Sequence, residues 1–175
     1  MEPEENLHFT STIEISTNKL WGAHFGVPAL IARVFEPQDG SRRVVCVLNE
    51  SVEYQCALLP KGDGSFLITV NKKIRDTLGL KAGSPVRVSL RKDESAYGLP
   101  MPEELAELLQ QDEDGNRLFQ ALTPGKQRTL LYIIGSVKQS DKRLARSLAI
   151  VEHLKANGGK INYRLLNEDL RKAYL

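Results

Sequence analysis

The sequence predicts an α+β protein, a small pseudo-duplicated β-barrel followed by a helical region, and three observations lead to this fold class. Short segments with alternating apolar and polar residues fill residues 6–92, and this period of two places one face of a strand on a core. The segments recur at a nearly constant offset, which indicates an internal repeat. Beyond Pro100 the apolar residues take the spacing of helices. We therefore expect a barrel domain at 1–92, a linker at 93–101 and a basic helical domain at 102–175.

The first half of the barrel begins with a strand at residues 7–15, where apolar and polar side chains alternate. An aromatic segment follows, and Pro28 then favours a short helix, because proline lacks the N–H that a first helical turn would leave unpaired. The β-branched runs 43–48 and 52–58 flank Asn49-Glu50-Ser51 and predict a hairpin.

The second half of the barrel repeats this order. A strand is expected at residues 66–70, and Asn71 can cap a helix at 72–78 by accepting a hydrogen bond from an otherwise unpaired backbone N–H. Gly79 supplies the left-handed residue that ends this helix, and a last strand covers 86–90.

Matching residues define the offset of the repeat. Val27-Pro28 precedes the first helix as Val70-Asn71 precedes the second, 43 residues later, and Val45 recurs as Val86, 41 residues later. Neither half can bury its apolar face alone, so we expect one closed or nearly closed barrel of six to seven strands. A barrel completed within one chain needs no second copy, and the protein is expected to be a monomer.

Helical periodicity and capping residues predict the elements of the tail. The expected helices are 102–111, 116–122, 124–137, 140–157 and a last one that begins near Asn167. Gly158-Gly159 ends the long helix, and Leu144, Leu148 and Val151 are spaced to form its inward face.

Composition limits the class of protein. The longest apolar runs are far shorter than the ~20 residues of a membrane span, and the acidic start of the chain is unlike a secretory signal, so we expect a cytoplasmic protein. Cys46 and Cys56 are the two cysteines. A tight turn between their strands places Cys46 near Glu53 rather than Cys56, so both thiols are expected to be free.

The net charge of +2 hides an asymmetry along the chain. Residues 1–116 carry 12 Lys and Arg against 18 Asp and Glu, whereas residues 117–175 carry 12 against 4. The basic tail therefore either binds an anionic ligand or nucleic acid, or neutralises the acidic stretch of its own chain. The candidate anion-binding residues are Lys138, Lys142, Arg143 and Arg146, and the alternative for them is a solvated helix face.

The sequence contains no recognisable catalytic constellation. His8, His24 and His153 are scattered, with no cysteine or carboxylate at ligand spacing, so we expect no metal, no cofactor and no enzyme activity. His24 is either a satisfied histidine at a barrel end or a base. Trp21 is either a core plug or the wall of a ligand site, and Trp21 or Arg75 is expected to face the tail across any ligand groove.

Two family resemblances add to this reading. Residues 66–88, including Leu78-Gly79 and the Gly83 turn, resemble the core of AbrB-like and MazE-like swapped-hairpin barrels. That resemblance implies a double-split barrel and, as the alternative function, nucleic-acid binding through basic residues. Those relatives build one barrel from two chains, whereas the repeat here supplies both halves in one chain.

A second resemblance covers almost the whole chain. The residues that carry it are Trp21, Val27-Pro28, 70–80, Gly83, Pro100, 122–124, 131–133, 136–138, Arg143 and Arg146. On these residues the chain resembles the bacterial YdeI/OmpD-associated family, named for bacteriocin protection. The resemblance implies a barrel domain of unknown function, a helical tail and a non-enzymatic binding or stress-protection role toward an unknown ligand.

Overall fold

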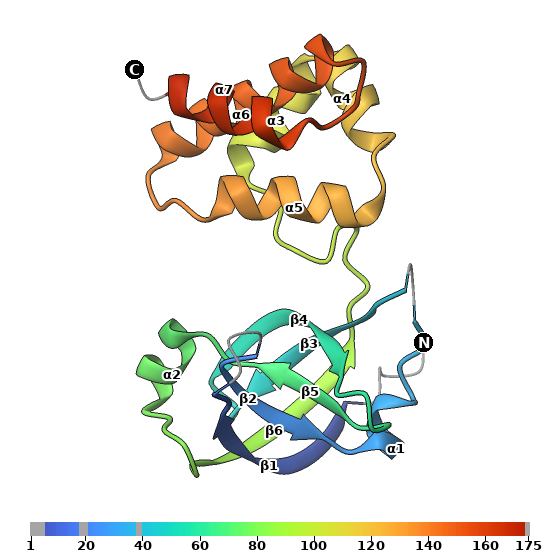
Figure 1. The fold of residues 1–175 in the computed structure, drawn as a ribbon, viewed down its shortest axis with the longest axis vertical. Helices are drawn as coiled ribbons and strands as arrows, with labels where there is room; N and C mark the ends of the chain where they lie inside the picture. The colour runs from blue at the N-terminus through green and yellow to red at the C-terminus, as the bar shows by residue number, and fades with distance from the viewer. Residues whose placement is uncertain (1–5, 18–20, 38–39, 174–175) are drawn as a thin grey trace. The chain divides into compact units, whose positions relative to one another are not determined.

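The structure is a computed structural model that describes residues 6–17, 21–37 and 40–173. The chain divides into two units, Met1–Glu94 and Ser95–Leu175, which carry the strands and most of the helices respectively (Figure 1). The predicted fold class is confirmed, because a closed barrel is followed by a helical region.

Six antiparallel strands close the barrel in the order β1-β2-β5-β4-β3-β6. The strands are β1 Leu7–Ile15, β2 Ala23–Val27, β3 Arg42–Leu48, β4 Val52–Pro60, β5 Phe66–Thr69 and β6 Pro85–Lys92. Helix α1 (Ala29–Ala32) follows β2, and helix α2 (Lys72–Leu78) follows β5, so strand, strand, helix, strand occurs twice, as the repeat predicts. Exchanging β1 with β4, β2 with β5 and β3 with β6 gives the same set of neighbouring strand pairs. This is the pattern expected of an internal two-fold symmetry.

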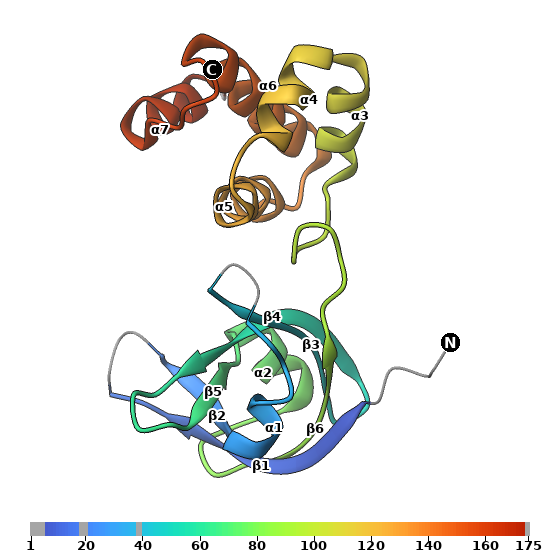
Figure 2. The same cartoon turned by 90° about the vertical axis from the view of Figure 1, so that its right-hand side faces the viewer.

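The two short helices lie at opposite ends of the barrel (Figures 1 and 2). Ala32 of α1 and Ile74 of α2 are buried in the same apolar core as the strand interiors. The predicted capping of α2 is confirmed: the Asn71 side chain accepts the N–H of Ile74 at 2.9 Å, and Gly79 ends the helix at φ 64°.

The β3–β4 hairpin turns through two left-handed residues, Asn49 and Glu50, at φ 50° and 56°. Cys46 is opposite Tyr54, one residue beyond the Glu53 that the sequence indicated, and both cysteine thiols are free as predicted. Two effects raise the pKa of the Cys56 thiol well above its ordinary value: the larger is a hydrogen bond with Cys46, and the second is burial.

Five helices of the second unit pack around a core of their own. They are α3 Glu103–Gln111, α4 Glu113–Gln120, α5 Pro124–Gly135, α6 Ser140–Ala156 and α7 Tyr163–Lys172. Helix α6 contacts each of the other four and is the central helix. The last helix begins earlier than expected, because Asn162 caps it by accepting the Leu165 N–H at 3.2 Å.

The inward face of α6 differs from the prediction. Val151 is buried as expected, but Leu144 and Leu148 are each 44% exposed. The buried face instead includes Ser147, whose hydroxyl donates to the Arg143 carbonyl at 2.7 Å. A polar side chain that is hydrogen-bonded within its own helix can be buried at little cost. A prediction that assigns only apolar residues to the buried face therefore placed this face one residue away from its observed position.

Residues 95–101, expected as part of a linker, contribute to the helical unit. Tyr97, Leu99 and Met101 pack against its apolar core, and the Tyr97 ring lies 5.8 Å from that of Phe119. Among the residues that the structure describes, no helix has both the length and the apolar character needed to cross a bilayer.

Candidate functional site

The candidate residues of the barrel unit lie around the start of β2 and on α2. Trp21 is half-buried, and its ring meets that of His24 edge-on at 5.8 Å. His24 is 4% exposed, and its two ring nitrogens face the Gly22 carbonyl at 3.1 Å and the Glu14 carboxylate at 3.3 Å. Both nitrogens therefore have partners. Of the two alternatives for His24, a satisfied histidine or a base, the structure favours the satisfied histidine.

Arg75 is half-buried on α2, and its Nε is a buried atom without a hydrogen-bond partner among the described residues. Trp21 and Arg75 both belong to the first unit. The groove that the sequence suggested between the tail and these two residues stays a prediction.

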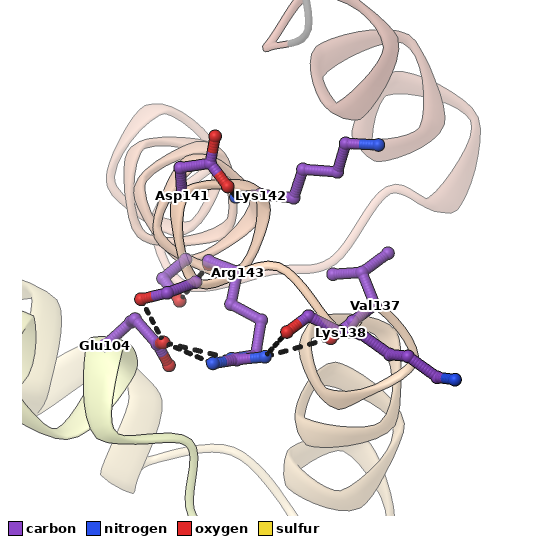
Figure 3. Close-up of polar contacts among 8 residues, drawn as sticks. Glu104, Val137, Lys138, Asp141, Lys142 and Arg143 are labelled. Carbon is purple, nitrogen blue, oxygen red and sulfur yellow. Dashed lines mark hydrogen bonds and ion pairs between the residues drawn. The ribbon is translucent and has the colours of Figure 1, made fainter.

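Arg143, in the first turns of α6, is the best-defined of the basic candidates (Figure 3). Its Nε and one terminal nitrogen lie 3.0 and 2.9 Å from a carboxylate oxygen of Glu104 on α3, and its other terminal nitrogen donates to the carbonyls of Val137 and Lys138. The Ser140 hydroxyl adds a 2.8 Å hydrogen bond to the same carboxylate. The hydrogen bond from Arg143, with smaller contributions from the Glu104 backbone and Ser140, lowers the pKa of Glu104 to about 2.

Arg146 lies one turn further along α6 and makes the same kind of contact. One terminal nitrogen donates to the Ile133 carbonyl and, at 2.8 Å, to the Ser136 hydroxyl. Together Arg143 and Arg146 satisfy carbonyls at and after the C-terminal end of α5, where a helix leaves its last acceptors unpaired. Sequence reasoning missed this role, although two arginines soon after a helix end are a signal for it.

Lys138 and Lys142 are arranged differently. Both are exposed, and Figure 3 shows their side chains directed away from the contacts between Arg143 and Glu104. Within the described ranges, the structure gives neither ammonium group an ion pair or a hydrogen bond. These two charges are therefore open to a partner in solution.

A cleft of about 310 Å³ lies beside this cluster in the helical unit. We call it the α5 cleft; it is lined by Leu99, Pro100, Met101, Pro102, Leu131, Tyr132, Gly135, Ser136 and Arg143. Tyr132, which lines this cavity, is 69% exposed. The cleft thus combines an apolar wall, an exposed ring and one guanidinium.

His153 is the one buried histidine of the helical unit among the residues described. Its Nε2 accepts the Asn162 N–H at 3.1 Å, so the ring proton is on Nδ1 and is donated to Asp169 at 3.0 Å. Both nitrogens are thereby engaged in joining α6, α7 and the loop between them, which is a structural role. No group of three His, Cys, Asp or Glu side chains in the described part of the chain is arranged to hold a metal ion.

Comparison with known protein families gives two matches. Residues 9–90 match a domain of unknown function, DUF1905, and residues 99–157 match the family described as bacteriocin-protection, YdeI or OmpD-associated. A search of the curated proteins finds no match. The second range contains the α5 cleft and all four basic candidates, Lys138, Lys142, Arg143 and Arg146.

Proposed function

The chain belongs to the bacteriocin-protection, YdeI or OmpD-associated family, with DUF1905 as its N-terminal domain, and on this basis we propose that it is a non-enzymatic binding protein. The proposed ligand is an acidic segment of a partner protein that also carries an apolar side chain. The proposed binding site is the α5 cleft with the lysines beside it. The observation that carries the proposal is an exposed aromatic ring that lines a cavity. Two exposed lysines, Lys138 and Lys142, lie within two residues in sequence of the lining residues Ser136 and Arg143.

The apolar part of the site supports a protein ligand. Tyr132 is exposed and lines the cavity together with Leu99 and Met101. Exposed aromatic residues next to small apolar pockets are the common anchors of protein interfaces, because one inserted side chain desolvates much area at little entropic cost. A cavity of about 310 Å³ has room for one large apolar side chain and its neighbours.

The charged part of the site selects the sign of the ligand's charge. Residues 117–175 carry 12 Lys and Arg against 4 Asp and Glu. Arg143 is neutralised by Glu104, so the uncompensated charge nearest in sequence to the cleft lining comes from Lys138 and Lys142. Complementary charge of this kind raises the association rate and excludes basic partners.

The test is fluorescence anisotropy of the full chain with a labelled peptide of Asp and Glu around a central leucine. A basic peptide of equal length and an unrelated DNA duplex are the comparison ligands. We expect the acidic peptide to bind, and we expect its affinity to fall as the salt concentration rises. We expect Tyr132→Ala and Lys138→Glu each to weaken binding about tenfold, and Lys160→Glu, an exposed lysine outside the cleft lining, to leave it unchanged.

Three outcomes would refute the proposal. The acidic peptide could fail to bind at low salt, Lys160→Glu could weaken binding as much as Lys138→Glu, or the DNA duplex could bind more tightly than the peptide. The last outcome would favour nucleic-acid binding instead, with the salt dependence typical of phosphate contacts.

We also propose that the protein works as a monomer in the cytoplasm. The described strands close the barrel within one chain, so neither half of the repeat needs a second copy to complete it, which supports the monomer. Both cysteines are free thiols, as is usual in a reducing compartment.

A further inference from the structure

A second cavity, of about 750 Å³, lies on the barrel and is separate from the α5 cleft. We call it the barrel groove; it is lined by His8, Phe9, Thr10, Val47, Glu50, Arg87, Val88 and Ser89. These residues come from β1, β3 and β6 and from the tip of the β3–β4 hairpin. Strands β1 and β3 both pair with β6, so the groove lies across three adjacent strands.

The hairpin tip holds Glu50 in a conformation that its residue type disfavours. At φ 56° the backbone is in the left-handed region. Glycine adopts this region without strain and asparagine is tolerated there, but glutamate is strained. Turns of this kind favour Asn-Gly, and here Asn49 is followed by glutamate. Non-glycine residues kept in this region often belong to functional sites.

The fold itself does not require the Glu50 side chain. The tip is fastened to β6 by Asn49, whose side-chain oxygen accepts the Arg87 N–H at 2.9 Å and whose own N–H donates to the Arg87 carbonyl at 2.9 Å. The Glu50 carboxylate makes one long contact, 3.7 Å to the Arg87 Nε, with the two side chains 85% and 65% exposed. An exposed pair at this distance contributes little to stability, so the strain has no structural compensation in the hairpin.

The groove presents one carboxylate, one guanidinium and the half-buried side chain of Val47. Glu50 and Arg87 supply the opposite charges, and Val47 supplies apolar surface, whereas Val88 is 2% exposed and belongs to the barrel core. Thr10 and Ser89 add hydroxyls that donate or accept. A ligand that satisfies all of these carries a carboxylate, an ammonium and an apolar side chain, whereas a phosphate dianion would be repelled by Glu50.

We propose that the barrel groove binds a free amino acid with an apolar side chain. The ligand carboxylate pairs with Arg87, whose planar guanidinium fits carboxylates in two-point contact. The ligand ammonium pairs with Glu50, and the ligand side chain lies over Val47. The proposal is independent of the α5 cleft, because every groove residue belongs to the first unit.

Titration calorimetry of the full chain with L-leucine tests this site. N-acetyl-leucine lacks the ammonium and leucinamide lacks the carboxylate, so both should bind at least about tenfold more weakly than leucine. Glu50→Gln should weaken leucine binding to the same extent. The matched control is Glu53→Gln. Glu53 lies on β4, next to β3, but outside the groove lining, so this variant should bind leucine as the wild type does.

Glu50→Gly separates a binding role from a structural one. Glycine relieves the left-handed strain, so this variant should melt at the same temperature as the wild type or higher while losing leucine binding. The proposal is overturned if leucine does not bind the wild type, if N-acetyl-leucine binds equally well, or if Glu50→Gly binds leucine unchanged. A lower melting temperature for Glu50→Gly would also overturn it, because the glutamate would then serve the fold.

Discussion

Replacing Glu104 with glutamine should destabilise the helical unit at neutral pH. Glu104 joins α3 to α6 through Arg143 and Ser140, and its side chain is 13% exposed. Glutamine keeps the shape and one acceptor oxygen but removes the charge. The variant therefore measures the charge-dependent part of this contact.

The size of the effect follows from the pKa of Glu104. Hydrogen bonding, first of all from Arg143, lowers this pKa from 4.5 to about 2, and at about 1.4 kcal/mol per pH unit the full linkage would be about 3 kcal/mol. Solvent screening near the surface reduces such values, so we expect a loss of about 1–2 kcal/mol. Because the pKa is lower in the folded state, the stabilisation is complete above pH 4.5 and is lost as pH falls toward 2.

Urea denaturation followed by far-UV circular dichroism measures this loss, since most helix lies in the second unit. Trp21, the single tryptophan, gives a separate fluorescence signal from the barrel. Glu103→Gln, in the same helical turn but exposed, is the matched control and should change the helical transition little. The reasoning is refuted if Glu104→Gln is as stable as the wild type at neutral pH, or if its deficit persists unchanged at low pH.

Three further predictions test other parts of the structure. Gly115→Ala should destabilise the helical unit by about 1–3 kcal/mol in the same urea assay, because a β-carbon there would lie 2.6 Å from the buried Val151 side chain. Gly125→Ala, with nothing within 4 Å, should be neutral or stabilising, and equal effects of the two changes would contradict the packing. The Cys56 thiol, its pKa raised by Cys46 and by burial, should react with iodoacetamide much more slowly in the native than in the unfolded chain, and equal rates would count against that environment. Light scattering after size exclusion should give the mass of one chain, 19.6 kDa, and an obligate dimer would contradict the monomer.

The sequence predicted best what depends on local chemistry. Asn71 and Gly79 bound α2 as expected, because capping and left-handed termination involve only neighbouring residues. The duplicated barrel was predictable for a related reason: a repeat visible in the sequence implies that its halves pair.

What depends on distant partners was predicted less well. The sequence leaves Arg143 and Arg146 as either anion ligands or part of a solvated helix face, and only the structure shows the acceptors on α3 and α5 that engage them. The exposed positions of Leu144 and Leu148 follow from which face of α6 its four neighbours cover, and periodicity leaves that choice open by one residue. The barrel groove had a local signal in the glutamate that follows Asn49, where glycine is the common turn residue.

The most direct test of the central claim, ligand binding at the α5 cleft, is a ¹H–¹⁵N correlation titration of the full chain with the acidic peptide. The account predicts that amide shifts concentrate at residues 99–102, 131–138 and 142–143, with the barrel signals unchanged. Shifts spread evenly over the basic residues of the helical unit, or no shifts at low salt, would contradict it.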